Sequence, residues 1–142
     1  MNQPATKKRV LIVEDEEELR SFMERTLSDI GYEVIAVADG LEGLNKARHL
    51  KPDIILLDVM LPKLNGFAIC RLLKYDQNYK NIPIVLWTWK EDDEDRMTGM
   101  ASGADAYLPK PFRLSELLAV MENLLDRDKR SVKRTGDAGE PV

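Results

Sequence analysis

The sequence predicts a three-layer α/β/α sandwich built on a five-stranded parallel sheet. Short apolar runs alternate five times with segments whose apolar residues recur at helical spacing. The third apolar run, 54–57, has no polar interruption, which is typical of a strand buried on both faces. Strands that alternate with helices are joined by right-handed crossovers, which put helices on both faces of the sheet.

In the first half of the chain, β-branched and leucine-rich runs indicate strands, and Pro52 and Pro62 bound the third of them. Apolar residues at helical spacing lie between the runs, and Gly31 is well placed to end the first helix. The expected elements are strand 10–13, a helix that ends near Gly31, strand 34–37, helix 41–50 and strand 54–57.

In the second half, Pro83 lies near the start of the fourth run, where proline is tolerated in a strand. The acidic residues 91–95 suit the positive end of a helix dipole and indicate the start of the fourth helix, which Gly103 ends. Leucines at helical spacing mark the last helix. The expected elements are helix 66–75, strand 82–87, a helix from 91, strand 105–108 and a helix over 114–126.

The composition predicts a soluble cytoplasmic protein. The chain has 142 residues, 44% of them hydrophobic and 32% charged, and a net charge of −4, which argues against direct nucleic-acid binding. Its single cysteine, Cys70, excludes an internal disulfide and fits a reducing compartment. No apolar stretch is long enough for a signal peptide or a membrane helix, so we expect no membrane insertion.

The sequence divides into three parts. Residues 1–7 are expected to be a disordered N-terminus and residues 8–126 a single domain. Beyond Asp126 basic and acidic residues alternate without an apolar period. We therefore expect 127–142 to be a disordered charged tail or the stub of a linker.

Polar residues follow the predicted strands at the ends that meet on one edge of a parallel sheet. Glu14 and Asp15 follow the first strand and Asp58 the third, Thr88 follows the fourth, and Lys110 comes soon after the fifth. Clustered carboxylates repel one another unless a cation lies between them, and carboxylate oxygens suit Mg²⁺. An aspartate can take up a phosphoryl group, whose oxygens a lysine and a hydroxyl can contact. Taken singly, each residue also fits a capping or surface role.

Taken together, these segments resemble the receiver domain of bacterial two-component response regulators. The resemblance covers about residues 8–126. The matching segments are Val10 to Glu16, Leu57 to Pro62 with Asn65-Gly66, Thr88, Gly103-Ala104-Asp105, and Tyr107 with Lys110-Pro111-Phe112.

The resemblance implies a flavodoxin-like fold with strand order 2-1-3-4-5, which the residues alone do not give. It also implies that Asp58 accepts a phosphoryl group from a histidine kinase or a phosphotransfer protein. By the same resemblance Glu14 and Asp15, with Asp58 and the backbone carbonyl of Met60, bind Mg²⁺.

The resemblance assigns the remaining residues as well. Thr88 and Lys110 contact the phosphoryl group, and Tyr107 corresponds to an aromatic switch residue that turns inward as Thr88 moves. The Lys110–Pro111 bond is expected to be cis.

Two positions depart from the family pattern. Trp89 stands where a small residue is usual, and we expect its indole to overhang Asp58 and to prolong the lifetime of the phosphorylated state. Ala106 replaces an acid that many DNA-binding members use in a dimer salt-bridge network. We therefore expect a monomer or a weak dimer.

The predicted function is that of a signalling switch that contacts a downstream protein through the fourth helix, the fifth strand and the last helix. We expect a phosphoacceptor rather than an enzyme, with its own dephosphorylation as its sole reaction. Two alternatives remain: a receiver-like adaptor that works without phosphorylation, and a Mg²⁺-dependent aspartyl phosphatase or phosphotransferase. Met60 counts against the latter, because a second acid is expected two residues after such a nucleophile.

Overall fold

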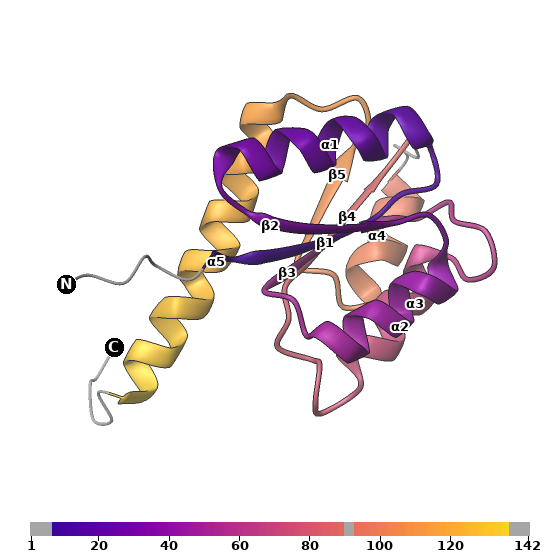
Figure 1. The fold of residues 1–142 in the computed structure, drawn as a ribbon. Coiled ribbons are helices and arrows are strands. Elements are labelled where there is room, and N and C mark those ends of the chain that lie inside the picture. Colours follow the sequence, from indigo (N-terminus) through magenta and orange to yellow (C-terminus); the bar gives the residue numbers. More distant parts are fainter. Residues whose placement is uncertain (1–6, 90–92, 137–142) are drawn as a thin grey trace.

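The computed structural model describes residues 7–89 and 93–136, the side chains of 93–96 and 127–136 excepted. Within these described residues, ten strands and helices alternate, and Figure 1 shows their arrangement. They are β1 (Arg9–Val13), α1 (Glu17–Ile30), β2 (Glu33–Val37), α2 (Gly40–Leu50), β3 (Ile54–Asp58), α3 (Gly66–Lys74), β4 (Ile84–Thr88), α4 (Asp93–Ala101), β5 (Ala106–Pro109) and α5 (Leu114–Gly136).

The five strands form one parallel sheet in the order β2-β1-β3-β4-β5. In its register Leu11 lies opposite Ile55 and Asp58 lies opposite Trp87. The predicted α/β class is confirmed, and so is the strand order that the resemblance implied. All five carboxyl ends of the strands therefore lie along one edge of the sheet.

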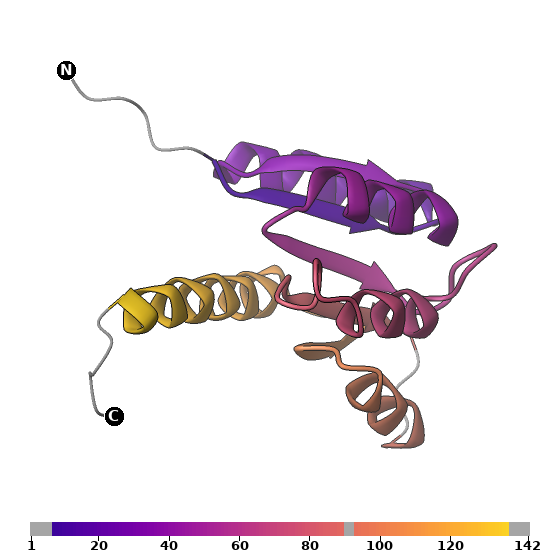
Figure 2. The ribbon, with the colours of Figure 1, turned by 90° about the horizontal axis from the view of Figure 1, so that it is seen from below.

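Helices cover both faces of the sheet (Figures 1 and 2). Leu11 and Ile55 pack with α2 and α3 on one face, whereas Ile12 and Leu56 pack with α1 and α5 on the other. The three inner strands, β1, β3 and β4, are buried on both sides, as the unbroken apolar run 54–57 predicts for β3. Burial of each such side chain contributes about 1.5–3 kcal/mol, so these strands hold the carboxyl edge rigidly.

Most predicted boundaries agree with the structure to within a residue or two. The second helix begins at Gly40, because Asp39 caps it by accepting from the Glu42 amide at 2.8 Å. The fourth strand begins at Ile84, after Pro83. Two of the acidic residues expected to open the fourth helix, Glu91 and Asp92, lie outside the described residues.

The last helix extends further than the sequence suggested. α5 continues past Asp126 to Gly136, where we expected a disordered charged tail or the stub of a linker. Arginine and lysine are good helix formers, so the charged composition of this segment does not prevent a helix. Figure 2 shows the C-terminal part of α5 extending beyond the end of the sheet. The division into a domain at 8–126 and a tail at 127–142 stays a prediction, and residues 1–6 and 137–142 lie outside the described part.

Among the described residues, none of the helices combines the length and the apolar character that crossing a bilayer requires.

Candidate functional site

Three carboxylates converge at the carboxyl edge of the sheet. Glu14 and Asp15 follow β1, and Asp58 is the last residue of β3. One ligand oxygen from each lies within 4.8 Å of the others. Glu14 is only 1% exposed and Asp58 4%, whereas Asp15 is exposed to solvent. The structure thus brings together the acids that the sequence predicted at this edge.

Lys110 reaches the same cluster from the loop after β5. Its Nζ donates to Glu14 Oε1 at 2.7 Å and lies 3.6 Å from Asp58 Oδ2. The side chain is almost fully buried, and the backbone amide donates to the Thr88 carbonyl at 2.7 Å. The Lys110–Pro111 bond is cis, as expected. The ammonium is therefore fixed between two carboxylates.

The loop after β3 folds back on Asp58. The Met60 amide donates to Asp58 Oδ1 at 3.3 Å, and the Gly66 amide donates to the Val59 carbonyl at 2.9 Å. A Cβ on Gly66 would lie 2.3 Å from the Asp58 carbonyl oxygen, so only glycine allows this close approach. The Met60 side chain is exposed. The role of its carbonyl as a metal ligand stays a prediction.

Thr88 and Tyr107 lie on neighbouring strands. Thr88 ends β4 and is fully buried, and Tyr107 in β5 is 7% exposed. The Tyr107 ring lies close to α4, since a Cβ on Gly99 would lie 2.9 Å from its Cδ2. Tyr107 thus points inward, toward the apolar cluster shared with α2 and α3. Its role as a switch stays a prediction.

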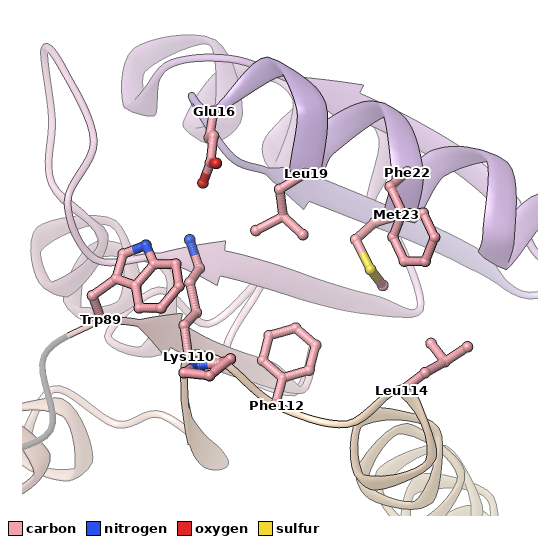
Figure 3. A pocket seen from close by; sticks show the side chains of 9 residues that line it. Glu16, Leu19, Phe22, Met23, Trp89, Lys110, Phe112 and Leu114 are labelled. Atoms are coloured by element: carbon pink, nitrogen blue, oxygen red, sulfur yellow. The ribbon is translucent and has the colours of Figure 1, made fainter.

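Two indoles flank the lysine. The Nζ of Lys110 lies 5.8 Å from the ring centroids of both Trp87 and Trp89. Trp89 is 59% exposed, and Figure 3 shows it beside the Lys110 side chain. Trp87 is fully buried and stacks on Phe112 with centroids 5.4 Å apart. Trp89 thus contacts Lys110, which lies beside Asp58. The predicted position of the indole above Asp58 itself stays a prediction.

An apolar pocket of about 200 Å³ opens next to Lys110 (Figure 3). It lies between the N-terminal half of α1 and the loop that joins β5 to α5. Its lining residues are Glu16, Leu19, Phe22, Met23, Trp89, Lys110, Pro111, Phe112 and Leu114.

The acidic cluster perturbs the ionisation of Asp58. The pKa of its carboxyl is raised to about 6, first by burial and then by the Glu14 carboxylate, while Lys110 and the Met60 amide act in the opposite direction. Asp58 is thus ionised at neutral pH, although burial and the Glu14 carboxylate both disfavour its charged form. The Lys110 ammonium offsets these two effects on the pKa only in part.

The residues present fit a divalent cation. Three carboxylates with oxygens within 4.8 Å supply the hard donors that Mg²⁺ favours. A positive ion beside them would also relieve the repulsion that raises the pKa of Asp58. Glu14, Asp15 and Asp58 are the side chains that could hold it.

Sequence reasoning missed three residues near the site. Trp87 fits an ordinary apolar strand residue, and Phe112 belongs to the matching segment Lys110-Pro111-Phe112 without an assigned role; no pattern indicates that the two rings stack. Arg20 lies on α1, and its Nη1 donates to the carbonyls of Glu14 at 2.9 Å and Asp15 at 3.4 Å. Its one available signal was a basic residue two positions after the five successive acids 14–18.

Comparison with known proteins supports one family. Residues 10–122 match the family model described as the response regulator receiver domain. "Response regulator MprA" of Mycobacterium avium (strain 104) is 42% identical over 121 residues, which cover 85% of this chain and 52% of that protein. "Probable transcriptional regulator ycf27" of Guillardia theta is 41% identical over 126 residues, which cover 89% of this chain and 48% of that protein. The chain thus spans about half the length of these curated relatives.

Solved structures show the same likeness. The chemotaxis protein CheY4 of Vibrio cholerae matches with a TM-score of 0.78 and 35% identity, over 84% of this chain and 99% of that one. The receiver domain of a sensor histidine kinase from Pseudomonas aeruginosa PAO1 matches with a TM-score of 0.79 and 30% identity, over 85% of this chain and 99% of that one. That structure is described with a magnesium ion coordinated in its active site cleft.

Proposed function

The chain belongs to the response regulator receiver domain family, and on that premise we propose that it is a phosphorylation-dependent signalling switch. A phosphoryl group passes to Asp58 from a histidine kinase or a phosphotransfer protein. The observation that carries this proposal is the buried Asp58 carboxylate, with its Oδ2 3.6 Å from the Lys110 ammonium beside two further acids. The protein acts as a phosphoacceptor, and its own reaction is limited to loss of that group.

The transfer uses groups that the fold holds in fixed positions. A carboxylate oxygen of Asp58 forms a bond to phosphorus while the bond from phosphorus to the donor imidazole nitrogen breaks, and that nitrogen keeps the electron pair. Lys110, anchored on Glu14, supplies positive charge to the phosphoryl oxygens. Thr88 donates its hydroxyl to one of them. At neutral pH the pKa of Asp58, about 6, leaves the carboxylate ionised for attack.

Glu14, Asp15 and Asp58 hold Mg²⁺ in this proposal, with the Met60 carbonyl as a further ligand. The ion, when bound, supplies charge that offsets the carboxylates and the phosphoryl oxygens. The three convergent carboxylates support this assignment, and so does the magnesium ion described in the Pseudomonas relative.

The signal then leaves through a shift between two packings of the same chain. Phosphorylation replaces the single negative charge of the Asp58 carboxylate with a phosphoryl group that carries roughly −1.5 to −2 charges, and it draws Thr88 toward that group. Tyr107 already lies inward in this structure, and in this proposal the movement of Thr88 stabilises that position, so the balance between conformers on the α4, β5 and α5 surface changes. Met97 and Met100 of α4 are exposed and belong to that surface.

We assign Trp89 the task of slowing dephosphorylation. Its indole lies 5.8 Å from the Lys110 ammonium and on the rim of the apolar pocket. A large ring there restricts the approach of water and of small phosphodonors to the cluster.

The partners in this proposal are a histidine kinase or phosphotransfer protein on the input side and a downstream protein on the α4, β5 and α5 surface. The domain works in the cytoplasm as a monomer or a weak dimer, without direct contact to nucleic acid. A relative named as a transcriptional regulator is about twice as long as the part it shares with this chain. Output on transcription would therefore involve regions of such proteins that this chain does not match.

The test is an intact-mass measurement after incubation with acetyl phosphate and Mg²⁺, beside Asp58→Ala and an EDTA control. We expect a gain of one phosphoryl group that both controls lose. A gain that persists in Asp58→Ala contradicts the assigned residue. If no gain occurs with acetyl phosphate, with the cognate kinase or in Trp89→Ala, the phosphorylation-independent adaptor replaces this proposal. Release of inorganic phosphate from a separate substrate would favour the phosphatase alternative.

A further inference from the structure

Arg20 contacts the carbonyls of three successive residues of the acidic loop, two through its side chain and one through the backbone bond that opens α1. Its Nη1 donates to the carbonyl of Glu14 at 2.9 Å and to that of Asp15 at 3.4 Å. Its backbone amide donates to the carbonyl of Glu16 at 2.9 Å. The side chain is half-buried at the start of α1, one helical turn beyond this loop. A single residue thus contacts every carbonyl of the segment 14–16.

The loop needs such support because its carboxylates lie close together and repel one another. Residues 14–16 are successive acids, and the Asp58 carboxylate faces two of them. Glu16 precedes α1 without a side-chain cap of its own. The loop is otherwise tied by the Glu14 amide to Val37 and by the Glu16 amide to Glu14 Oε2. Asp15 is exposed, so its orientation depends on the backbone that carries it.

The contacts of the guanidinium with this loop are to carbonyl oxygens and not to the carboxylate oxygens of Glu14 or Asp15. Lys110 acts differently, because it bonds Glu14 Oε1 directly. Arg20 therefore brings positive charge to the acidic loop without competing with a cation for the side-chain ligands. Both bonds come from one nitrogen, Nη1, whose N–H groups are fixed in the guanidinium plane, whereas the donors of an ammonium rotate on a flexible stem.

We propose that Arg20 is a positioning residue for the Mg²⁺ site: by holding the Glu14 and Asp15 carbonyls, it keeps both carboxylates directed at the cation. This inference rests on the proposed function, since it concerns the ion that phosphorylation requires. It adds a residue on α1 to the site residues on the strand ends and loops.

The first test is Mg²⁺ binding measured by isothermal titration calorimetry. Loss of a residue that orients metal ligands typically weakens metal affinity by 10- to 100-fold, so we expect Arg20→Met to raise the dissociation constant about tenfold. Arg20→Lys keeps the charge and loses the planar guanidinium, and should give an intermediate loss. Arg25→Met removes the same charge from an exposed position on α1 and should bind within about twofold of the wild type.

The second test reads the loop itself by amide hydrogen exchange in EDTA. We expect faster exchange at residues 14–16 in Arg20→Met than in the wild type or in Arg25→Met. A residue with only a general structural role would lower the thermal midpoint and leave the Mg²⁺ dissociation constant unchanged. Should Arg20→Met fail to fold by circular dichroism, Arg20→Lys decides the question through both measurements.

Equal Mg²⁺ affinity in Arg20→Met and Arg25→Met would overturn the inference. Full retention of affinity in Arg20→Lys would also overturn it, because charge alone would then account for the effect. The proposed function fails separately: a wild-type protein that binds Mg²⁺ and never gains a phosphoryl group on Asp58 contradicts the switch and leaves the role of Arg20 intact.

Discussion

Lys110 Nζ donates to Glu14 Oε1 at 2.7 Å, joining residues 96 positions apart in the sequence at a buried edge of the sheet. One ammonium thereby balances one carboxylate. Asp58 and Asp15 remain beside them, so the cluster keeps an excess of negative charge. The fold holds these acids together because the strands that carry them are fixed by apolar burial on both faces.

Removal of Lys110 should be costly for stability. In Lys110→Met the Glu14 carboxylate stays buried without its partner, and breaking a buried pair in this way costs about 3–5 kcal/mol. Urea unfolding in EDTA measures the loss. The double variant Glu14→Gln with Lys110→Met should recover much of it, and a double variant as unstable as Lys110→Met alone would contradict this account.

Asp58 should make stability depend on pH. Its folded pKa of about 6 lies above the ordinary value of 3.8, so the folded state binds this proton more tightly than the unfolded state. The resulting stabilisation is fully present below about pH 4 and is lost as the pH rises through 6. Asp58→Asn in EDTA should therefore be more stable than the wild type at pH 7.5, by on the order of 1–3 kcal/mol.

Thermal and urea unfolding across pH 4 to 8 check this expectation. The difference between Asp58→Asn and the wild type should shrink toward pH 4, where the wild-type carboxyl is protonated. Saturating Mg²⁺ should stabilise the wild type more than the variant, because binding to the folded state adds to its stability. A difference that is constant over this pH range would refute the assignment.

Gly66→Ala should disrupt the site by displacing the backbone next to Asp58. The new Cβ would lie 2.3 Å from the Asp58 carbonyl oxygen, so the loop after β3 has to move. We expect a loss of about 2 kcal/mol or more in urea unfolding, together with slower phosphorylation of Asp58. Asn65→Ala is the matched control, since it removes the cap on the Ala68 amide at a cost of about 1 kcal/mol and should keep the site active.

Trp89→Ala should shorten the lifetime of the phosphorylated protein several-fold. The indole beside Lys110 is the only large side chain that the loop after β4 adds to the rim of the pocket among the described residues. Intact mass followed over time after removal of the phosphodonor gives the rate. Trp89→Phe keeps an aromatic ring and should lie between the two; equal rates in all three proteins would rule out the shielding role.

Much of the fold is visible in the sequence because burial on two faces requires unbroken apolar runs. β3 is predicted for that reason, and the placement of the acids and the lysine at one edge of the sheet follows from parallel topology. The strand order came from the resemblance, since apolar patterns do not state which strands are neighbours.

Other features depend on contacts that no local pattern encodes. Arg20 acts through backbone carbonyls, so neither the residue type nor the spacing points to its partners. The Trp87–Phe112 stack joins two elements whose meeting depends on the whole fold. The length of α5 was underestimated because a charged segment without an apolar period fits either a helix, since lysine and arginine are good helix formers, or a disordered tail.

The two indoles beside Lys110 give the protein an intrinsic optical probe. The chain has two tryptophans, and both have the same ammonium 5.8 Å from their ring centroids. The charge of that ammonium acts on both rings. A movement of Lys110 should therefore change the fluorescence of the buried Trp87 and of the exposed Trp89 together. Trp87→Phe and Trp89→Phe would separate their signals, and the site could be followed in real time without a label.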